Sequence, residues 1–387
     1  MKLSKGSSVL ILSHFNERSD NAEFPPQLVR DYLQGKIKTI VYIEHAFPYS
    51  KDHRSSMTIY ENGILKKHIF SPQIFGPEAL FYILDIFITF YFLIIARVHF
   101  DLCIALDNLN TLSVLPFKKA KLVKKLVFYT IDYTPFRFKN KILNSIYHFI
   151  DRIACYNADA IWVVSPRMIS ARKNNGVNSK KTAPSISLPI GANLSRIKII
   201  PIEKINRSDI VFVGHLLEKQ GVQLVLESLP KIISKIPDLR FIVIGQGEYE
   251  QTLKDLTISL NIGNHVIFKG FVDNHRDVEN ILCKSAVGLA PYVPTPDNFT
   301  VYADPGKIKL YVACGLPVVV TDVPAIAHVI KSQKAGLVID YTTNSFVKAL
   351  TKLLSDDALH KTYRENAIKL SMDYDTSSLI EKALVKL

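Results

Sequence analysis

The sequence predicts an α/β fold of two Rossmann-like domains that face each other across a cleft, with a C-terminal helix returning to the first domain. The chain has 387 residues, and one hydrophobic core rarely grows beyond about 250 to 300 residues, so two domains are expected. Short apolar runs alternate with helix-length segments in both halves, which is typical of parallel sheets. Pro and Gly residues at 188–192 lead toward a linker. We expect domains at residues 1–200 and 201–370 and the returning helix at 371–387.

The first half opens as a βαβ unit. An apolar run at residues 8–13 is followed by a polar loop at 14–23, a helical pattern at 26–33 and a second strand at 39–44. Asn62 and Gly63 indicate a hairpin turn, and Pro166 stands where proline opens a helix. Further strands are expected at 101–106, 126–131 and 160–165, and a helix at 141–157. This half is therefore predicted to be doubly wound.

Residues 79–96 form the most apolar segment, and Asp85 is its one charged residue. Eighteen apolar residues lie at the lower limit of a membrane span. The segment leads directly into the strand expected at 101–106, so we favour a helix buried on the sheet and partly exposed to lipid. A true span is the alternative. In either case its aromatic residues could contact an apolar acceptor.

The second half repeats the pattern with six apolar runs, and these predict a second parallel sheet. A helix is expected at 222–235, and Ser378 with Glu381 has the spacing of a capping box at the start of the last helix. The six strands are expected at residues 210–214, 240–245, 266–268, 287–290, 318–321 and 337–339.

Composition narrows the function classes. The formal charge of +13 suits phosphate-bearing partners. The densest basic run, at 118–125, has no interleaved aromatic residues, so nucleic acid is not expected. Four separated cysteines show no metal-binding spacing, and the first residues contain no long apolar core of a signal peptide. We therefore expect a cytoplasmic protein without a bound metal, with peripheral contact to the inner face of the membrane as an open possibility.

The segment from residue 304 to residue 320 carries the strongest functional signal. It reads Asp-Pro-Gly-Lys-Ile-Lys-Leu-Tyr-Val-Ala-Cys-Gly-Leu-Pro-Val-Val-Val, which predicts a short helix, a glycine stop and a buried strand. Lys307 and Lys309 would lie at the helix start. A helix N-terminus attracts anions, and lysines beside it strengthen the attraction. The segment is interpreted as the binding site of a diphosphate.

Residues 209–355 resemble the nucleotide-sugar-binding half of GT-B glycosyltransferases, most closely glycosyltransferase family 4. The resemblance rests on four segments in the same order and spacing. They read Val-Gly-His-Leu-Leu-Glu-Lys-Gln-Gly from Val213, Phe-Ile-Val-Ile-Gly-Gln-Gly-Glu from Phe241, Phe-Lys-Gly-Phe-Val from Phe268 and Tyr-Val-Ala-Cys-Gly-Leu-Pro-Val-Val from Tyr311. The first half resembles the family only in its layout.

The resemblance implies donor-binding roles for several residues. Gly214 would let the backbone approach the diphosphate, Lys219 would supply a positive charge, and His215 stands where the family often has Arg. Phe271 and Val272 would contact the base. The motif Gly-Gln-Gly at 245–247 is assigned to the fold and not to the site.

One departure concerns the donor ribose. The family has a Glu five residues before the Gly of the Ala-Cys-Gly step, and this chain has Leu310 there. Either ribose is held differently, by Asp304 or by backbone groups, or donor binding has been lost and the domain is a scaffold. The glycine turns and the lysines Lys307 and Lys309 favour the first alternative.

The first half would supply the acceptor site. Asp132 follows a predicted strand and is the catalytic candidate, because the family places a His or Asp near this point. Arg137 could hold an acceptor phosphate. The other acceptor-site candidates are His14, Asp107, Asn108 and Tyr133.

The favoured function is transfer of a hexose from a nucleotide diphosphate sugar, UDP- or GDP-linked, to a hydroxyl of a glycan or lipid-linked glycan. The resemblance implies retention at the anomeric carbon. No metal is expected, because lysines and a helix N-terminus can neutralise the leaving diphosphate. Two alternatives stay open. A sugar-nucleotide epimerase shares the fold, and a catalytically silent partner at the membrane would explain Leu310 together with the apolar helix.

Overall fold

The computed structural model describes residues 3–15, 24–295 and 297–387. The chain divides into two compact units, one formed by Met1–Pro189 with Ile380–Leu387 and the other by Ile190–Leu379. The units therefore separate between residues 189 and 190 rather than at residue 200. Most of the polar loop predicted at 14–23, from residue 16 onward, lies outside the described residues.

Unit 1 contains an eight-stranded sheet with the order β4-β3-β2-β1-β5-β6-β7-β8. Neighbouring strands are parallel except at β3, which pairs antiparallel with both β2 and β4. The β3–β4 turn at Asn62 and Gly63 is the predicted hairpin. The strands are β1 (Ser8–Phe15), β2 (Thr39–Ala46), β3 (Ser56–Glu61), β4 (Ile64–Phe70), β5 (Phe100–Leu106), β6 (Val123–Thr130), β7 (Ala160–Val163) and β8 (Ser185–Ser187).

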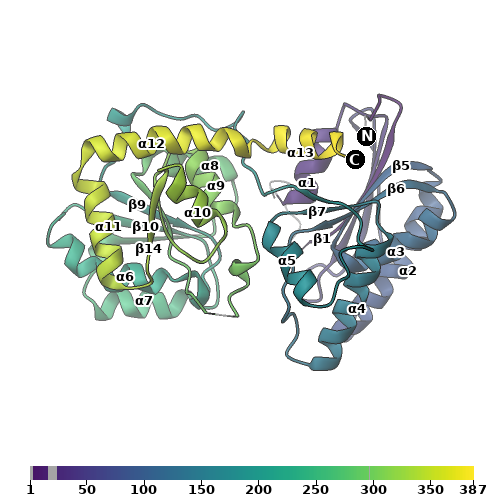
Figure 1. The fold of residues 1–387 in the computed structure, drawn as a ribbon, viewed down its shortest axis with the longest axis horizontal. Coiled ribbons are helices and arrows are strands. Elements are labelled where there is room, and N and C mark those ends of the chain that lie inside the picture. Colours follow the sequence, from purple (N-terminus) through teal and green to yellow (C-terminus); the bar gives the residue numbers. More distant parts are fainter. Residues whose placement is uncertain (1–2, 16–23, 296) are drawn as a thin grey trace. The chain divides into compact units, whose positions relative to one another are not determined.

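Helices connect these strands, and Figure 1 shows α2, α3 and α4 gathered on one side of unit 1. Helix α3 packs against both α2 and α4. Apolar side chains of β1, β2 and β5 form a core with α2 and α3, in which Leu10, Val41, Phe92 and Val114 are buried. The helices are α1 (Pro25–Leu33), α2 (Glu78–Ala96), α3 (Asp107–Lys119), α4 (Lys141–Asn157) and α5 (Pro166–Asn174).

Helix α2 covers the predicted apolar segment, but it is only partly buried. Among the described residues it is the one helix that is long and apolar enough to cross a membrane. Phe81 and Phe92 are buried, whereas Phe87 and Ile94 are exposed. The expectation of a helix lying on the sheet with one side exposed fits this arrangement.

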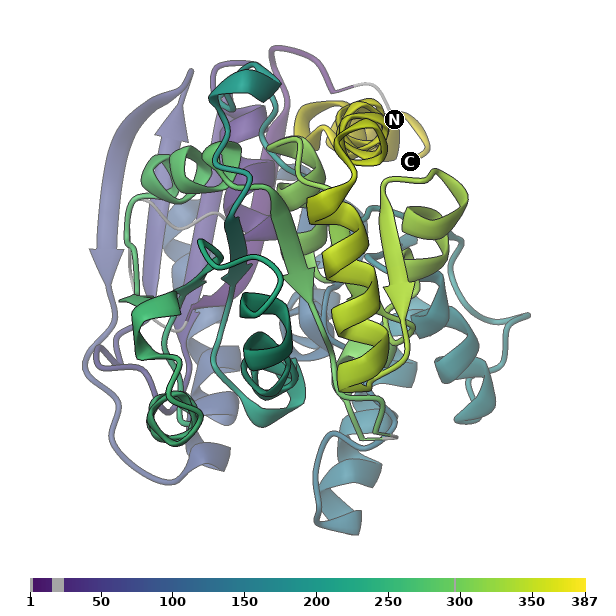
Figure 2. The same cartoon turned by 90° about the vertical axis from the view of Figure 1, so that its left-hand side faces the viewer.

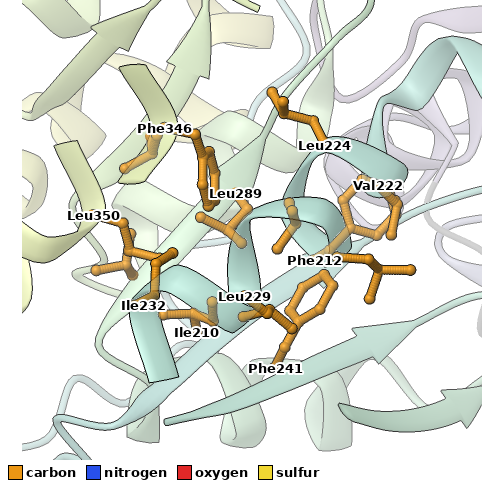
Figure 3. Close-up of a cluster of buried hydrophobic side chains, with 14 of the residues drawn as sticks. Ile210, Phe212, Val222, Leu224, Leu229, Ile232, Phe241, Leu289, Phe346 and Leu350 are labelled. Atoms are coloured by element: carbon orange, nitrogen blue, oxygen red, sulfur yellow. The ribbon is translucent and has the colours of Figure 1, made fainter. Parts of the chain in front are cut away.

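Unit 2 contains a six-stranded sheet with the order β11-β10-β9-β12-β13-β14, parallel throughout. The six predicted runs are its six strands. Phe212, Leu229, Phe241 and Phe346 lie in one buried apolar cluster of this unit (Figure 3). The strands are β9 (Asp209–Val213), β10 (Arg240–Ile244), β11 (Val266–Gly270), β12 (Val287–Ala290), β13 (Val318–Thr321) and β14 (Gly336–Ile339).

The helices of unit 2 include α9, which begins where the basic segment predicted it. In the turned view of Figure 2, α11 runs lengthwise along the front and α12 is seen nearly end-on. Short 3₁₀ turns complete the unit. The helices are α6 (Val222–Ile233), α7 (Glu250–Ser259), α8 (His275–Lys284), α9 (Gly306–Ala313), α10 (Ile326–Ser332), α11 (Thr343–Ser355) and α12 (Asp357–Ser371).

The last helix, α13 (Thr376–Val385), ends in unit 1, since Ile380–Leu387 group with that unit as expected. Its predicted cap is wrong. The carboxylate of Asp375 accepts the backbone N–H of Ser378, so the helix begins earlier and Ser378 lies inside its first turn.

Each sheet has one topological switch point, where the strand order reverses. In unit 1 it lies between β1 and β5, and in unit 2 it lies between β9 and β12. Ligands of open parallel sheets bind beyond the carboxyl ends of the strands at this point. The two switch points are therefore the places to look for a site.

Candidate functional site

Gly214 lies directly after β9, at the switch point of unit 2. Its φ of +142° is a conformation that residues with side chains rarely adopt. A Cβ atom built on Gly214 would lie 2.8 Å from Lys307 Nζ. The missing side chain thus lets the backbone of this turn lie against the lysine, so two of the predicted donor-binding residues are neighbours.

Lys307, in the first turn of α9, is a half-buried cation at this switch point. Its Nζ donates a hydrogen bond of 2.6 Å to Gln220 Oε1 and lies 3.9 Å from the ring centroid of Phe212. Within the described part of the chain no carboxylate pairs with it. Burial holds the pKa of Lys307 well below its usual value, because a charge without a counter-ion is costly in an apolar environment. An anion bound here would supply the missing counter-charge.

Gly245 and Gly247 serve packing. A Cβ on Gly245 would lie 2.0 Å from the carbonyl oxygen of Gly214, and one on Gly247 would lie 2.3 Å from that of Leu216. The two loops therefore touch backbone to backbone. This agrees with their assignment to the fold, and it fixes the position of the Gly214 turn.

Lys219 does not join Lys307. Its ammonium group pairs with Asp297 at the surface, and the neighbouring Gln220 is the residue that contacts Lys307. His215 is exposed. Lys219 and His215 therefore remain candidates only for a donor that reaches the rim of the site.

Asp304 and Lys309 are placed differently from the prediction. Lys309 is fully buried, and its Nζ pairs with Asp304 Oδ1. The other oxygen of Asp304 accepts the backbone N–H of Ile190 at 2.8 Å. Both groups are thus engaged in holding α9 to the first residue of unit 2. The predictions that Lys309 contacts the diphosphate and that Asp304 holds the ribose are wrong for this arrangement.

Phe271 and Val272 follow β11, the edge strand of the sheet. Phe271 is exposed and Val272 is half-buried, so Phe271 is free to pack on a planar ring. Leu310 packs against the apolar core on the α9 side of the sheet. The Leu310 side chain therefore offers no polar group to a ribose.

The switch point of unit 1 carries a buried cluster of charges. His14 lies at the end of β1, not in the following loop. Its Nδ1 lies 2.8 Å from Asp107 Oδ2, and its Nε2 lies 3.1 Å from Asp85 Oδ2. Burial alone would lower the pKa of His14, but Asp107 and Asp85 raise it to about 10. The imidazole is therefore charged at neutral pH and donates to both carboxylates.

Asp107 adopts a left-handed conformation, with φ of +68°, which costs about 1 to 2 kcal/mol for a residue with a side chain. The strain is offset because the carboxylate accepts the backbone N–H of Asn110 at 2.9 Å as well as the His14 ring. The carboxylate is 38% exposed, while His14 is 3% exposed. Asp107 is thus the accessible member of the cluster.

Sequence reasoning overlooked three members of this cluster. Asp85 was treated only as an interruption in the apolar helix, and His45 and Asn110 were not selected. His45 Nδ1 lies 3.2 Å from Asp85 Oδ1, and its Nε2 is 2.8 Å from Thr89 Oγ1. A signal was available, since Asp85 and Thr89 are four residues apart and share one helix face.

Asp132 follows β6 at the same edge of the sheet, as predicted. Its carboxylate pairs with the Arg137 guanidinium. Burial raises the pKa of Tyr49 and of Tyr82, and the charges of Arg137 and Glu78 also act on both values. The two tyrosines therefore lie near Arg137 and Glu78. Tyr82 contacts the His14 ring at a centroid distance of 6.4 Å and thereby connects the two charged pairs.

Two of the acceptor-site candidates are structural. Tyr133 is buried, and its ring lies 4.5 Å from the guanidinium carbon of Arg172, which forms a buried pair with Asp151. Asn108 is buried too, and it donates to the carbonyl of Tyr147. Neither side chain reaches the surface, so the prediction that they bind an acceptor is corrected. Over the described residues, no cluster of three or more metal-ligating side chains occurs.

Comparison with known proteins finds relatives of the second half of the chain. Residues 196–370 match the model of the family described as glycosyl transferases group 1. An uncharacterized glycosyltransferase of Methanocaldococcus jannaschii is 30% identical over 163 residues, which cover 41% of this chain and 39% of that protein. A GDP-mannose-dependent alpha-(1-6)-phosphatidylinositol monomannoside mannosyltransferase of Mycolicibacterium smegmatis is 23% identical over 157 residues, covering 39% of this chain and 40% of its own. The matched stretch thus spans less than half the length of these relatives.

Solved structures match both units. Sucrose-phosphate synthase from Thermosynechococcus elongatus has a TM-score of 0.73 at 15% identity and covers 97% of each chain. Anabaena HepE in complex with UDP has a TM-score of 0.70 at 13% identity, with 98% of each chain covered. These likenesses show the fold, which is GT-B. The predicted fold class and the resemblance to GT-B glycosyltransferases are confirmed.

Proposed function

We propose that this protein, whose residues 196–370 match the glycosyl transferases of group 1, transfers a hexosyl group from a nucleotide diphosphate sugar to an acceptor hydroxyl. The donor would be a UDP- or GDP-sugar, and the acceptor a glycan or lipid-linked glycan in the synthesis of a polysaccharide. We propose retention at the anomeric carbon and a leaving diphosphate stabilised by protein groups rather than by a metal ion.

The ammonium group of Lys307, which has no paired carboxylate among the described residues, is the observation that carries this proposal. It lies beside the Gly214 backbone at a topological switch point, next to the first turn of α9. A diphosphate in this position would receive a charge-assisted hydrogen bond from Lys307 and the favourable field of a helix N-terminus. The charge that develops on the leaving group would thus be stabilised by groups that are already in place.

Unit 1 supports an acceptor site at its own switch point. Asp107 and the Asp132–Arg137 pair offer exposed charged groups beside the exposed ring of Tyr49. Arg137 suits an acceptor phosphate. Catalysis by Asp132 requires that it leave Arg137, because a carboxylate held by a guanidinium is a weak base. We place the protein in the cytoplasm, peripheral on the inner face of the membrane, which fits its four free cysteines.

The alternatives make different demands. An epimerase needs paired acids near the sugar, and the acid at the rim of the unit 2 site, Asp297, is paired with Lys219. A silent scaffold would keep Leu310 but would not need an uncompensated cation at Lys307. Glycosyl transfer is therefore favoured over both alternatives, and a measurement of nucleotide binding distinguishes it from the silent scaffold.

Titration calorimetry with UDP, GDP and ADP tests the proposal. One of the three should bind, and Lys307→Met should weaken it by about 10- to 100-fold, because a hydrogen bond to a charged group contributes about 1.5 to 3 kcal/mol. Lys254→Met is the matched control, since Lys254 lies on α7 and pairs with Glu250. Absence of binding to every nucleotide would support the silent scaffold, and equal loss in both variants would remove Lys307 from the site.

A further inference from the structure

Helix α2 turns its apolar residues outward. Ile83, Phe87, Tyr91 and Ile94 are each more than half exposed, and their spacing of four, four and three residues places them in one stripe. Four large apolar side chains in one exposed stripe are unusual for a soluble surface. A face of this kind indicates an interaction site.

The opposite face of α2 buries Phe81 and Phe92 and also carries two polar side chains where it meets the sheet. Asp85 and Thr89 are buried there, and they contact His14 and His45 respectively. A helix that packs on a core normally exposes polar residues on its outer face, so α2 is inverted in this respect. The contacts of the inner face fix α2 on the sheet and, among the described residues of unit 1, leave the apolar stripe exposed.

Helix α4 repeats this inverted pattern. Ile142, Ile146 and Phe149 are exposed along one stripe, while His148 and Asp151 are buried. Asp151 is held by a bidentate pair with Arg172, so the charge inside the protein is compensated. Two helices on the same side of the sheet therefore both direct apolar residues to the outside.

Helix α3 lies between them and packs on both; the three helices form the group at the lower right of Figure 1. Asn108, Asn110 and Thr111 are buried, whereas Leu109 and Leu112 are only half-buried. We call the exposed sides of α2, α3 and α4 together the apolar face. Of the described acidic residues on these helices, Asp85 and Asp151 are buried and paired, Asp107 is paired with His14, and Glu78 is exposed at the start of α2, where it accepts from Tyr82.

Basic residues flank the apolar face at both ends. The three helices follow parallel strands and so run in the same direction. Arg97, Lys119 and Lys121 are exposed at their C-terminal ends, and Lys139 and Lys141 are exposed at the N-terminal end of α4. Cations around an apolar stripe complement a surface that carries phosphate groups above hydrocarbon.

We propose that the apolar face is a docking surface for a bilayer that contains anionic phospholipids, with α2 and α4 lying in the plane of the interface. A spanning arrangement of α2 would expose Asp85 to hydrocarbon and would break its contact with His14. In the interfacial arrangement α2 keeps the contacts of Asp85 with His14 and of Thr89 with His45. The surface lies in unit 1, so the inference does not depend on the donor chemistry proposed for unit 2.

Vesicle flotation of the full chain tests this surface. Vesicles of phosphatidylcholine with phosphatidylglycerol in equal parts should carry the protein, and phosphatidylcholine alone should carry at least tenfold less. Phe87→Glu with Phe149→Glu should reduce binding at least tenfold. Ile258→Glu is the matched control, because Ile258 is an equally exposed apolar residue on α7 of unit 2. Unchanged binding of the double variant, or equal loss in the control, would overturn the proposal.

A fluorescent reporter distinguishes the interface from a span and from a protein partner. The chain has one tryptophan, Trp162, which is buried in β7, so Phe87→Trp adds a single exposed reporter. Vesicles should shift its emission to the blue, and lipids brominated near the headgroup should quench it more than lipids brominated near the chain end. Deep quenching would indicate a span. A blue shift with rising protein concentration and no lipid would indicate a second copy, and either result would overturn the proposal.

The nucleotide titration keeps this proposal separate from the proposed function. The double variant Phe87→Glu with Phe149→Glu should bind nucleotide as the unaltered protein does, which also shows that it is folded. Loss of vesicle binding with intact nucleotide binding in the double variant would support the docking surface. Vesicle binding by the unaltered protein together with no binding of any nucleotide would leave only the docking surface standing.

Discussion

His14 and Asp85 form an ion pair that joins the end of a central strand to the middle of the most apolar helix. The distance from Nε2 to Oδ2 is 3.1 Å, and both side chains are 3% exposed. Asp107 holds the other ring nitrogen of His14, and His45 lies beside Asp85. The pair is thus the main polar connection that keeps α2 on the sheet while its other side faces outward.

The stability of unit 1 should therefore fall at alkaline pH. His14 has a folded pKa of about 10 against an ordinary value of 6.5, so its stabilising contribution is complete below pH 6.5 and is lost as the pH rises to 10. His14→Gln should lower the free energy of unfolding at pH 6.5 by about 3 kcal/mol, because it leaves Asp85 buried without its partner. Urea unfolding followed by the fluorescence of Trp162, which lies in unit 1, measures both effects.

The control for this measurement is His328→Gln. His328 is exposed on α10 of unit 2, 3.5 Å from Asp322, so its loss should change stability by less than about 0.5 kcal/mol. If His14→Gln and the unaltered protein lost stability in parallel between pH 6.5 and 10, the ion pair could not be the cause of the alkaline effect.

Lys309 and Asp304 should affect folding and not nucleotide binding. Lys309 is buried, and its partner Asp304 has a side chain only 11% exposed, so Lys309→Met should cost about 3 kcal/mol by leaving a largely buried carboxylate unpaired. The double change Lys309→Met with Asp304→Asn should recover part of this loss. Thermal unfolding and nucleotide titration of the same samples measure stability and nucleotide affinity together. If folded Lys309→Met bound nucleotide tenfold more weakly, Lys309 would belong to the donor site after all.

The sequence could have separated the two lysines of α9. Residues two apart on a helix point to nearly opposite sides, so Lys307 and Lys309 could not both face one ligand. The basic segment correctly predicted that Lys307 lies at the start of a short helix before a buried strand, because glycine, proline and the apolar run fix the local order. Lys309 pairs with Asp304 only five positions away, but the place of Asp304 was not predictable, since its contact with Ile190 joins residues 114 positions apart.

The glycine turns should respond differently to alanine. In Gly214→Ala the new Cβ would lie 2.8 Å from Lys307 Nζ, the end of a flexible side chain, so the lysine can move and nucleotide affinity should fall about tenfold. In Gly245→Ala the Cβ would lie 2.0 Å from a backbone oxygen, so the loop must shift and the protein should lose about 3 kcal/mol or more of stability.

Gly263→Ala provides the comparison, since no atom lies within 4 Å of the Cβ it would add. Its melting temperature and nucleotide affinity should match those of the unaltered protein. An unchanged affinity in Gly214→Ala would mean that the diphosphate does not use this turn.

Nucleotide binding should take up a proton at Lys307. Burial depresses the pKa of Lys307 in the free protein, and a bound diphosphate would raise it by supplying the opposite charge. In the pH range between these two pKa values, binding adds a proton, so affinity weakens as the pH rises. Calorimetry above pH 7 in buffers of different ionisation enthalpy measures the uptake, and Lys307→Met should abolish it. An equal uptake in that variant would assign the proton to another group.

The charged cluster of unit 1 shows what sequence reasoning cannot reach. The strand ends at His14, Asp107 and Asp132 were predictable, because apolar runs end there and parallel strands bring their carboxyl ends to one edge. The contact of His14 with Asp85 spans 71 positions and crosses from a strand to a helix that reads as uniformly apolar. No local sequence pattern encodes such a pair. The free-energy cost of burying its two charges is offset only in the folded protein, where the two side chains meet.

Asp132 and Arg137 give the last test, which separates catalysis from charge pairing. If Asp132 acts on the acceptor hydroxyl, Asp132→Asn should lower turnover by about 10²- to 10⁴-fold while nucleotide affinity stays unchanged, because the residue lies in unit 1. Arg137→Gln should instead raise the KM for a phosphorylated acceptor and free the Asp132 carboxylate from its pair. Nucleotide release from UDP- and GDP-sugars with lipid-linked glycans as acceptors measures both. If the double variant turned over no more slowly than Arg137→Gln alone, Asp132 would act only by positioning Arg137, and the catalytic role would have to pass to another group such as Asp107.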